Sequence, residues 1–193
     1  MSAEPVPPDP PPWQPDPVRQ RQAAYTIEDV LDLPPDAPRV ELLDGVITVV
    51  PSPSLDHQDI SFLLCAWLRR HAPSHYRAAI AVGVAVGVRT TYEPDVVLYR
   101  TGASGSHHYL TPEEVVLVAE VVSPGTKRRD RITKPAGYAD AGIAHYWRVE
   151  QDPLHVYAYR LQAGRYELVA DSAEALEVAE PFPVKLSVSE LRP

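Results

Sequence analysis

Two acidic residues stand in parts of the chain that otherwise read as β-strands. Glu120 interrupts the apolar run VVLVAEVV, and Asp95 opens the run DVVLY directly after Pro94. Burying an unpaired carboxylate is costly, so a residue such as Glu120 usually lies at a strand end, pairs with a cation or binds a metal ion. Proline is tolerated at the margin of a sheet, which places Asp95 at such a margin. If the two runs form neighbouring strands, the two carboxylates can meet at one site.

The chemistry that such a pair could perform follows from the ligands it offers. Two carboxylates, a backbone carbonyl and water molecules make an oxygen-rich site suited to Mg²⁺ or Mn²⁺. A metal ion held there can stabilise charge on a phosphodiester and activate an attacking water. The two acids therefore point to phosphodiester hydrolysis.

A basic segment, SPGTKRRDRITK, follows Glu120 in a chain that is acidic overall. A compact basic loop beside a carboxylate pair is what a polyanionic substrate needs. Lys134, near the start of the helix expected next, could orient the attacking water or offset developing negative charge. The other cations of this segment are candidates for phosphate contacts: Lys127, Arg128, Arg129 and Arg131.

Each of these features also has a purely structural interpretation. Asp95 could belong to an ordinary turn at the start of a strand, and Glu120 could form an ion pair with an arginine of the basic segment. The basic segment could be a solvated loop, as most charge runs are. The sequence contains neither a G-x-x-x-x-G-K phosphate loop nor a G-x-S-x-G nucleophile elbow, so metal-dependent hydrolysis is the chemistry that its motifs favour.

The first elements expected along the chain are helices and a hairpin. A short helix is expected over residues 26–33. Residues 39–50 have the pattern of a β-hairpin that turns at Asp44-Gly45, which places Glu41 on a strand. A helix from the N-cap Ser54 to about His71 carries His57, because apolar residues recur there at helical spacing.

The remaining elements should form the sheet and cover it. Strands are expected over 76–88, 94–99 and 113–122, the last of them apolar on both faces and therefore central. Alternation along that strand puts Glu120 on one face with Val116 and Val118. A second helix should cover about 133–141 and end at Gly142, before strands over 144–150, 153–161 and 165–170.

Length and composition set the domain organisation. A chain of 193 residues fits one domain with short extensions. Residues 1–22 hold eight of the 22 prolines, so we expect a disordered proline-rich arm there and the folded domain over 23–193. The only cysteine is Cys65, which excludes an intrachain disulfide and a cysteine zinc cage.

The charge and the apolar pattern narrow the class of partner. No stretch approaches the roughly 20 apolar residues that cross a bilayer, and the first residues lack a secretory signal, so we expect a cytoplasmic protein with no membrane partner. The net charge of −8 argues against a protein that coats nucleic acid through bulk positive charge. A local basic site remains compatible with that charge.

From about Tyr25 to Leu168 the sequence resembles the Uma-two family of restriction endonuclease-like proteins, within the PD-(D/E)XK nuclease superfamily. The resemblance rests on the segments VELLDGVI, PSPSLDHQDI, EPDVVLY and VAEVVSPGTKRRDRITKPAGYADAGIAHYWRVE, of which the long one is the specific part. It implies an α/β fold with a restriction-endonuclease-like mixed β-sheet flanked by helices, with additional β-hairpins.

The resemblance also implies roles for the residues that match the family motif. Asp95 and Glu120 would be the acidic metal ligands, and a lysine would complete the site. The superfamily pattern places that lysine two residues after the Glu, where this chain has Val122. In families like this one the lysine lies on the next helix, and Lys134 matches that place.

Glu41 and His57 match further polar positions of the family motif and are implied at the same cleft. Each also has a structural alternative, since Glu41 could pair across the hairpin and His57 could cap a helix or pack in the core. The primary hypothesis is a Mg²⁺-dependent (or Mn²⁺-dependent) DNA endonuclease. Asp95, Glu120 and the Val121 carbonyl would hold the metal ion.

Two rival functions remain. One is a nuclease-fold protein that binds nucleic acid or acts as a scaffold without hydrolysing it. The other is a metal-dependent hydrolase of RNA or of a small phosphoester. Folds of this type often pair for two-strand cleavage, so a homodimer is an expectation, although the sequence carries no dimer-specific signal.

Overall fold

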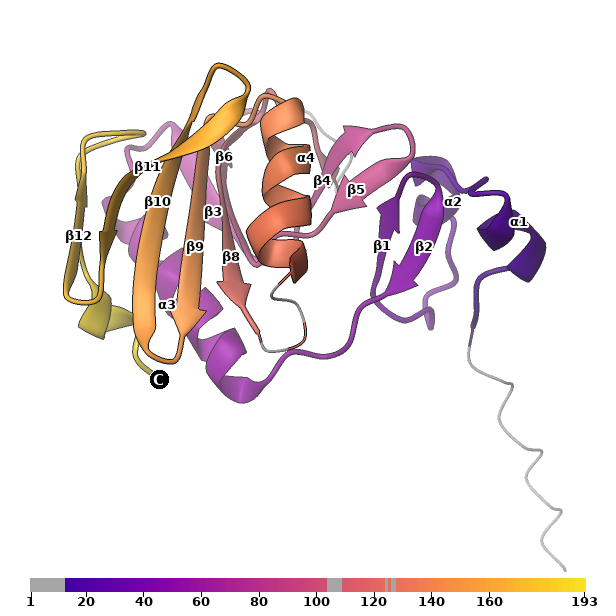
Figure 1. Cartoon of the computed structure of the whole chain (residues 1–193), viewed down its shortest axis with the longest axis horizontal. Coiled ribbons are helices and arrows are strands. Elements are labelled where there is room, and N and C mark those ends of the chain that lie inside the picture. The colour runs from indigo at the N-terminus through magenta and orange to yellow at the C-terminus, as the bar shows by residue number, and fades with distance from the viewer. Residues whose placement is uncertain (1–12, 104–108, 124, 126–127) are drawn as a thin grey trace, which may run out of the picture.

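A six-stranded mixed sheet forms the centre of the fold (Figure 1). The computed structural model describes residues 13–103, 109–123, 125 and 128–193, and all statements below concern these residues. The strand order is β11-β10-β9-β8-β6-β3, in which β8 and β9 are parallel and the other neighbours are antiparallel. The strands are β3 (Tyr76–Ala79), β6 (Val96–Arg100), β8 (Val115–Val122), β9 (His145–Gln151), β10 (Leu154–Gln162) and β11 (Arg165–Ser172).

The two main helices cover opposite faces of this sheet (Figure 1). Helix α3 (Leu55–His71) begins at the N-cap Ser54, as its sequence predicts, and packs on β3, β6 and β8. Helix α4 (Lys134–Asp140) follows a π-helical turn, η1 (Arg129–Thr133), and lies on the other face. The predicted mixed α/β fold with helices on both sides of a sheet is therefore confirmed.

A second sheet extends from the end of the molecule that carries the N-terminal helices (Figure 1). Its order is β2-β1-β5-β4-β7, made of β1 (Val40–Leu43), β2 (Val46–Val49), β4 (Gly83–Gly87), β5 (Thr90–Tyr92) and β7 (Tyr109–Leu110). Strands β1 and β2 are the predicted hairpin. Asp44 and Gly45 form its turn with φ angles of +49° and +80°. These positive φ angles explain why Asp and Gly occupy the turn, because most other residues adopt such angles only at a cost in conformational energy.

A third, two-stranded sheet closes the core on the α3 side. It consists of β12 (Ala175–Val178) and β13 (Val184–Ser187), followed by a 3₁₀ turn, η2 (Val188–Leu191). Leu176, Leu186 and Leu191 are fully buried in the cluster that α3 also lines. This C-terminal part of the chain completes the main core.

Strand β8 carries the buried acidic residue through the middle of the main sheet. All eight of its residues are buried. Val118 lies in the core cluster on the α4 side, as alternation from Glu120 predicts, but Val116 lies in the α3-side cluster. The reason is a bulge: Leu98 of β6 pairs with Leu117 and Tyr99 with Val115, so Val116 is an extra residue that breaks the alternation.

The expected single strand over 76–88 is divided between the two large sheets. Residues 76–79 form β3 at the edge of the main sheet, and 83–87 form β4 in the second sheet. Ala81 between them has a φ of +55°, which interrupts the extended backbone. One continuous β-like pattern thus links the two sheets.

The end of the proline-rich segment differs from the arm expected over residues 1–22. Pro17–Arg21 form a short helix, α1, whose N-terminus is capped by the Asp16 side chain. The Asp16 amide donates to the Tyr25 hydroxyl at 2.6 Å, and the Ile47 amide donates to the Gln20 side chain at 3.1 Å. These contacts attach the segment to β2 and to the region of helix α2 (Ile27–Leu31).

None of the helices in the described ranges combines the length and the apolar character that a membrane crossing requires.

Candidate active site

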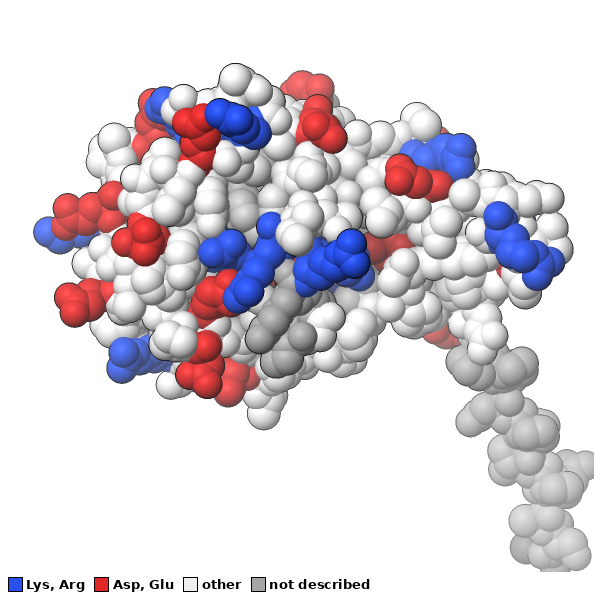
Figure 2. Space-filling model, viewed as in Figure 1, with Lys and Arg blue, Asp and Glu red and all other residues white. Residues whose placement is uncertain are grey.

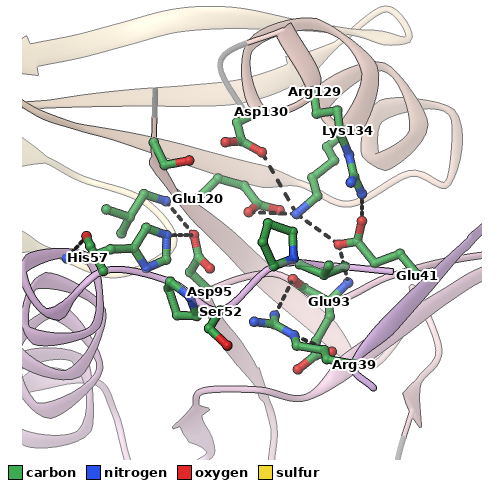
Figure 3. Close-up of a pocket in the computed structure, with 16 residues that line it drawn as sticks. Arg39, Glu41, Ser52, His57, Glu93, Asp95, Glu120, Arg129, Asp130 and Lys134 are labelled. Atoms are coloured by element: carbon green, nitrogen blue, oxygen red, sulfur yellow. Dashed lines mark hydrogen bonds and ion pairs between the residues drawn. The ribbon is translucent and has the colours of Figure 1, made fainter. Parts of the chain in front are cut away.

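A cavity of about 160 Å³ opens where the second sheet, the start of α3 and the η1–α4 segment meet the main sheet (Figure 3). All five residues predicted as catalytic line it, together with Val121. The charged or titratable residues of the lining are Arg39, Glu41, His57, Glu93, Asp95, Glu120, Arg129, Asp130 and Lys134. The structure thus brings together side chains that lie up to 95 positions apart in the chain, from Arg39 to Lys134.

Asp95 lies just before β6, and two neighbours fix its carboxylate. The Val121 amide donates to Asp95 Oδ2 at 2.8 Å, and His57 Nε2 lies 3.1 Å from the same oxygen. The first contact exists because β6 pairs with β8, with Val96 opposite Ala119. Residue 95 is thereby brought to the backbone just after Glu120.

His57 reaches Asp95 from the first turn of α3. Its amide donates to the N-cap Ser54 Oγ at 3.3 Å, and its side chain is largely buried. Burial acts to lower the pKa of the imidazole, but the hydrogen bond and the charge of Asp95 outweigh it and leave the pKa above its usual value. His57 Nδ1 is itself buried and has no hydrogen-bond partner among the described residues.

Glu120 is the most deeply buried acid of the site, with 1% of its surface exposed. Lys134 Nζ donates to Oε2 at 3.0 Å, and the Tyr138 hydroxyl donates to Oε1 at 2.7 Å. Burial raises the pKa of Glu120 to about 8, and nearby Asp95 adds to the effect of burial, whereas Lys134 and the Tyr138 hydrogen bond act against it. The charge of this carboxylate is only partly compensated.

Lys134 lies between two buried acids at the start of α4 (Figure 3). Its Nζ is 3.0 Å from Glu120 Oε2, 3.2 Å from Glu41 Oε1 and 4.0 Å from Asp130 Oδ1. Glu41 in turn contacts the Arg129 guanidinium. Pro135 stands in the first helical turn, where proline costs little, and does not prevent Lys134 from reaching the cavity.

The oxygen atoms at this cavity are of the kind that a hard divalent cation binds. Asp95 and Glu120 offer carboxylate oxygens at one cavity, and Val121 lines the same cavity. A buried carboxylate with a pKa raised to about 8 is also a group that a divalent cation would stabilise. In the described part of the chain, no three His, Cys, Asp or Glu side chains are grouped to hold a metal ion, so such a site would need backbone and water oxygens as well.

The candidates for phosphate contacts lie in different places. Arg129 lines the cavity beside Glu41, and Arg128 is exposed next to it. Arg131 points elsewhere: its guanidinium makes two hydrogen bonds to Glu150, at 3.0 and 2.8 Å, and lines a different cavity. Lys127 lies outside the described residues.

Sequence reasoning missed two side chains of this site. The Tyr138 hydroxyl donates a hydrogen bond to Glu120, and the buried Asp130 faces Lys134 from one turn earlier. A signal for Tyr138 was present, because it follows Lys134 by four positions and so shares its helix face. Asp130 had no such signal, since the π-helical turn that buries it is not readable from the sequence.

Comparisons with known proteins identify the family and the fold of the chain. A model of the Uma2 family, described as "Putative restriction endonuclease", matches residues 27–190. The crystal structure of "a putative nuclease belonging to DUF820" from Anabaena variabilis ATCC 29413 superposes with a TM-score of 0.68 at 20% identity, over 86% of this chain and 97% of that chain. This similarity shows that the two proteins share a fold.

A second solved structure, NucC from P. aeruginosa ATCC27853 in its cAAA-bound form, superposes with a TM-score of 0.35 at 12% identity, over 63% of this chain and 85% of that chain. This likeness is too low to support a conclusion. No curated protein matches the chain.

Proposed function

The chain belongs to the Uma2 family, and from this premise we propose that it is a Mg²⁺-dependent or Mn²⁺-dependent endonuclease that hydrolyses DNA phosphodiester bonds. The observation that carries the proposal is that Asp95, Glu120 and Lys134 line one cavity, with Glu41 and His57 beside them. Buried ion pairs contribute little to stability relative to apolar packing, and perturbed carboxyl groups in a cleft are typical of functional sites.

Asp95 and Glu120 would hold the metal ion, with the Val121 carbonyl as a further oxygen donor. The bound metal would stabilise charge on the phosphodiester and lower the pKa of an attacking water. The Val121 amide and His57 keep the Asp95 carboxylate in one orientation, at 2.8 and 3.1 Å. Tyr138 positions Glu120 from the other side in the same way, at 2.7 Å. Donors that are held in place before the substrate arrives lose less entropy on binding.

Lys134 would orient the attacking water or offset the negative charge that develops on the phosphate. An ammonium group has three N–H donors, and here Glu120 accepts one while Glu41 lies 3.2 Å away. Asp130 lies 4.0 Å away, beyond hydrogen-bond distance, so the third donor can serve a water or a phosphate oxygen. Glu41, itself in contact with Arg129, holds the ammonium group in place.

The substrate class rests on charge and shape. Arg129 lies at the cavity with one third of its side chain exposed, and the exposed Arg128 adjoins it. In a chain with a net charge of −8, such a local group of arginines suits a polyanion that approaches the cavity itself. DNA is the polyanion that we propose.

The test is incubation of the purified chain with supercoiled plasmid, linear duplex DNA, single-stranded DNA and RNA, each with Mg²⁺, Mn²⁺ or EDTA. We expect cleavage of DNA with either metal and none in EDTA. Glu120→Gln, which keeps the size of the side chain and removes its charge, should abolish cleavage. Nicked circles would report single cuts, and direct linearisation would report two copies acting together as a homodimer.

Each contrary result rejects a specific part of the proposal. Cleavage that persists in EDTA contradicts the metal requirement, and cleavage of RNA alone contradicts DNA as the substrate. Wild-type protein that binds DNA but cuts nothing with either metal is a binding or scaffold protein, and the nuclease proposal then fails.

A further inference from the structure

The chain has a second cavity, of about 320 Å³, between α4 and the open face of the main sheet. One wall is α4, with the small apolar residues Pro135, Ala136 and Ala139. The opposite wall is the sheet, with Tyr146 of β9, Tyr159 of β10 and Tyr166 of β11. Arginines 131, 148 and 165 also line the cavity, as does Asp140. A slot between an apolar wall and aromatic rings, edged by cations, suits a flat ring that carries a negative charge.

Strand alternation explains why these groups gather on one face. On β10, Val156 and Ala158 point into the α3-side core, so Tyr157 and Tyr159 point to the other face. Pairing puts Arg148 of β9 opposite Tyr157. Figure 1 shows α4 beside this face of β9 and β10, and no other helix of the described residues lies over these two strands on that side. The face is therefore open to a ligand.

The rings and cations of this face are in contact. The Tyr146 ring lies 5.7 Å from the Tyr159 ring and 5.4 Å from the Tyr166 ring, centre to centre. The Arg148 guanidinium lies 4.2 Å from the centre of the Tyr157 ring and 5.6 Å from that of Tyr159. The position of the Tyr166 ring is fixed by a hydrogen bond, which its hydroxyl donates to the Ile143 carbonyl. These contacts preorganise the aromatic wall, which reduces the entropy lost when a ring stacks there.

The charge of the cavity is positive in an acidic chain. Three arginines and one aspartate line it, and Glu150 pairs with Arg131 and Arg148 at 2.8 and 3.1 Å. Arg165 lies 3.4 Å from Glu167, and 78% of its side chain is exposed, so this ion pair is weak and leaves the guanidinium accessible to a ligand. Figure 2 shows Lys and Arg side chains gathered in the middle of this face of the molecule. The Arg131–Glu150 pair is bidentate, but 43% of the Arg131 side chain is exposed, so a phosphate can approach the guanidinium from its solvent side.

One short segment of the chain, residues 129–135, contributes side chains to both cavities. Arg129, Asp130 and Lys134 line the candidate active site, whereas Arg131 and Pro135 line the second cavity. A nucleic-acid strand whose scissile phosphate lies at Lys134 would therefore carry its flanking nucleotide past Arg131. Bases in a duplex stack on one another and cannot offer a face to the tyrosines, whereas unpaired bases can.

We propose that the cavity between α4 and β9–β11 binds an unpaired nucleotide that flanks the cut, so that the substrate is DNA with a single-stranded segment. The base would lie between the α4 wall and Tyr159, and its phosphate would contact Arg131. The position of this nucleotide beside a cut rests on the proposed nuclease function. The binding itself does not depend on hydrolysis.

The test is binding in EDTA, where no metal-dependent cleavage occurs. A short fluorescein-labelled single-stranded DNA and a duplex of the same sequence are titrated with the full chain, and the anisotropy gives each Kd. Wild type should bind the single strand more tightly than the duplex. Tyr159→Ala should raise the Kd for the single strand about tenfold, and Tyr159→Phe, which keeps the ring, should leave it unchanged.

An arginine pair of equal exposure provides the matched control. Arg131 and Arg160 each have 43% of the side chain exposed, and each pairs with a glutamate, at 2.8 and 2.9 Å. Arg160 follows Tyr159 on β10 and so points to the opposite face of the sheet. Arg131→Gln should weaken binding and reduce the slope of log Kd against log salt by about one, whereas Arg160→Gln should change neither.

Several outcomes would overturn the inference. These are a duplex that binds as tightly as the single strand, an unchanged Kd for both Arg131→Gln and Tyr159→Ala, an equal loss in Arg160→Gln, and a wild type that binds no single strand. Circular dichroism of each variant separates lost binding from lost folding, and Arg131→Gln keeps the test valid if Tyr159→Ala unfolds. If the single strand binds as expected but is not cut with Mg²⁺ or Mn²⁺, the nuclease proposal fails and this inference stands.

Discussion

Replacement of Lys134 by methionine should destabilise the protein far more than the same replacement at a surface lysine. Lys134 is buried, 3.0 Å from Glu120 and 3.2 Å from Glu41. Lys185 is a matched control, because its Nζ lies 3.2 Å from Glu177 but its side chain is 81% exposed. The two lysines have similar contacts and differ in burial.

The structure sets the size of each effect. Removing one partner of a buried ion pair costs about 3–5 kcal/mol, because the other charge stays buried without compensation. We expect the lower end, about 3 kcal/mol, for Lys134→Met. Burial has already raised the pKa of Glu120 to about 8, so its carboxyl group can take up a proton, and Arg129 remains beside Glu41. Lys185→Met should cost about 1 kcal/mol or less.

The assay is urea denaturation in EDTA at neutral pH, followed by circular dichroism, with the free energy of unfolding extrapolated to water. The double variant Glu120→Gln/Lys134→Met should lose at least about 1 kcal/mol less than the sum of the two single losses, because the two side chains interact directly. Equal losses for Lys134→Met and Lys185→Met would refute this account of the buried pair. Strict additivity in the double variant would refute the direct contact between Lys134 and Glu120.

Three further predictions concern single side chains. Tyr138→Phe should lower the free energy of unfolding by about 1–3 kcal/mol in urea denaturation, because a buried oxygen of Glu120 loses its donor; an unchanged midpoint would contradict this. Gly137→Ala should destabilise the protein despite better helix propensity, because an added Cβ would lie 2.6 Å from the Tyr92 ring; a higher melting temperature would contradict it. Burial lowers the pKa of His145, so the folded state favours the neutral ring, and stability should fall as the pH drops below about 6.5. In urea denaturation at several pH values, His145→Asn should make that fall shallower, and an equal fall in the variant would argue against this cause.

The parts of the fold that local pattern determines were predictable. Helix α3 begins at Ser54, the β1–β2 hairpin turns at Asp44-Gly45, and α4 ends just before Gly142, all as the sequence predicts. The pairing partners of the strands were not predictable in the same way. The alternation over 76–88 is the same whether the residues form one strand or two, and the division at Ala81 depends on which sheet each half joins.

The residue types of the candidate site were readable from the sequence, but their contacts were not. Glu120 stood out because a carboxylate in an apolar strand needs a partner. The Val121 amide that holds Asp95 depends on the register between β6 and β8, which no local pattern encodes. Arg129 and Arg131 looked equivalent in the basic segment. The π-helical turn directs one to the candidate active site and the other to the second cavity.

One comparison of cleavage rates tests the central claim most directly. Asp95 and Asp171 each pair with a histidine, at 3.1 and 2.7 Å, but only Asp95 lies at the candidate active site. With Mn²⁺ and plasmid DNA, Asp95→Asn should lower the single-turnover rate at least about a hundredfold, because an essential metal ligand is lost. Asp171→Asn should cleave at the wild-type rate. Equal rates for Asp95→Asn and wild type would contradict the account.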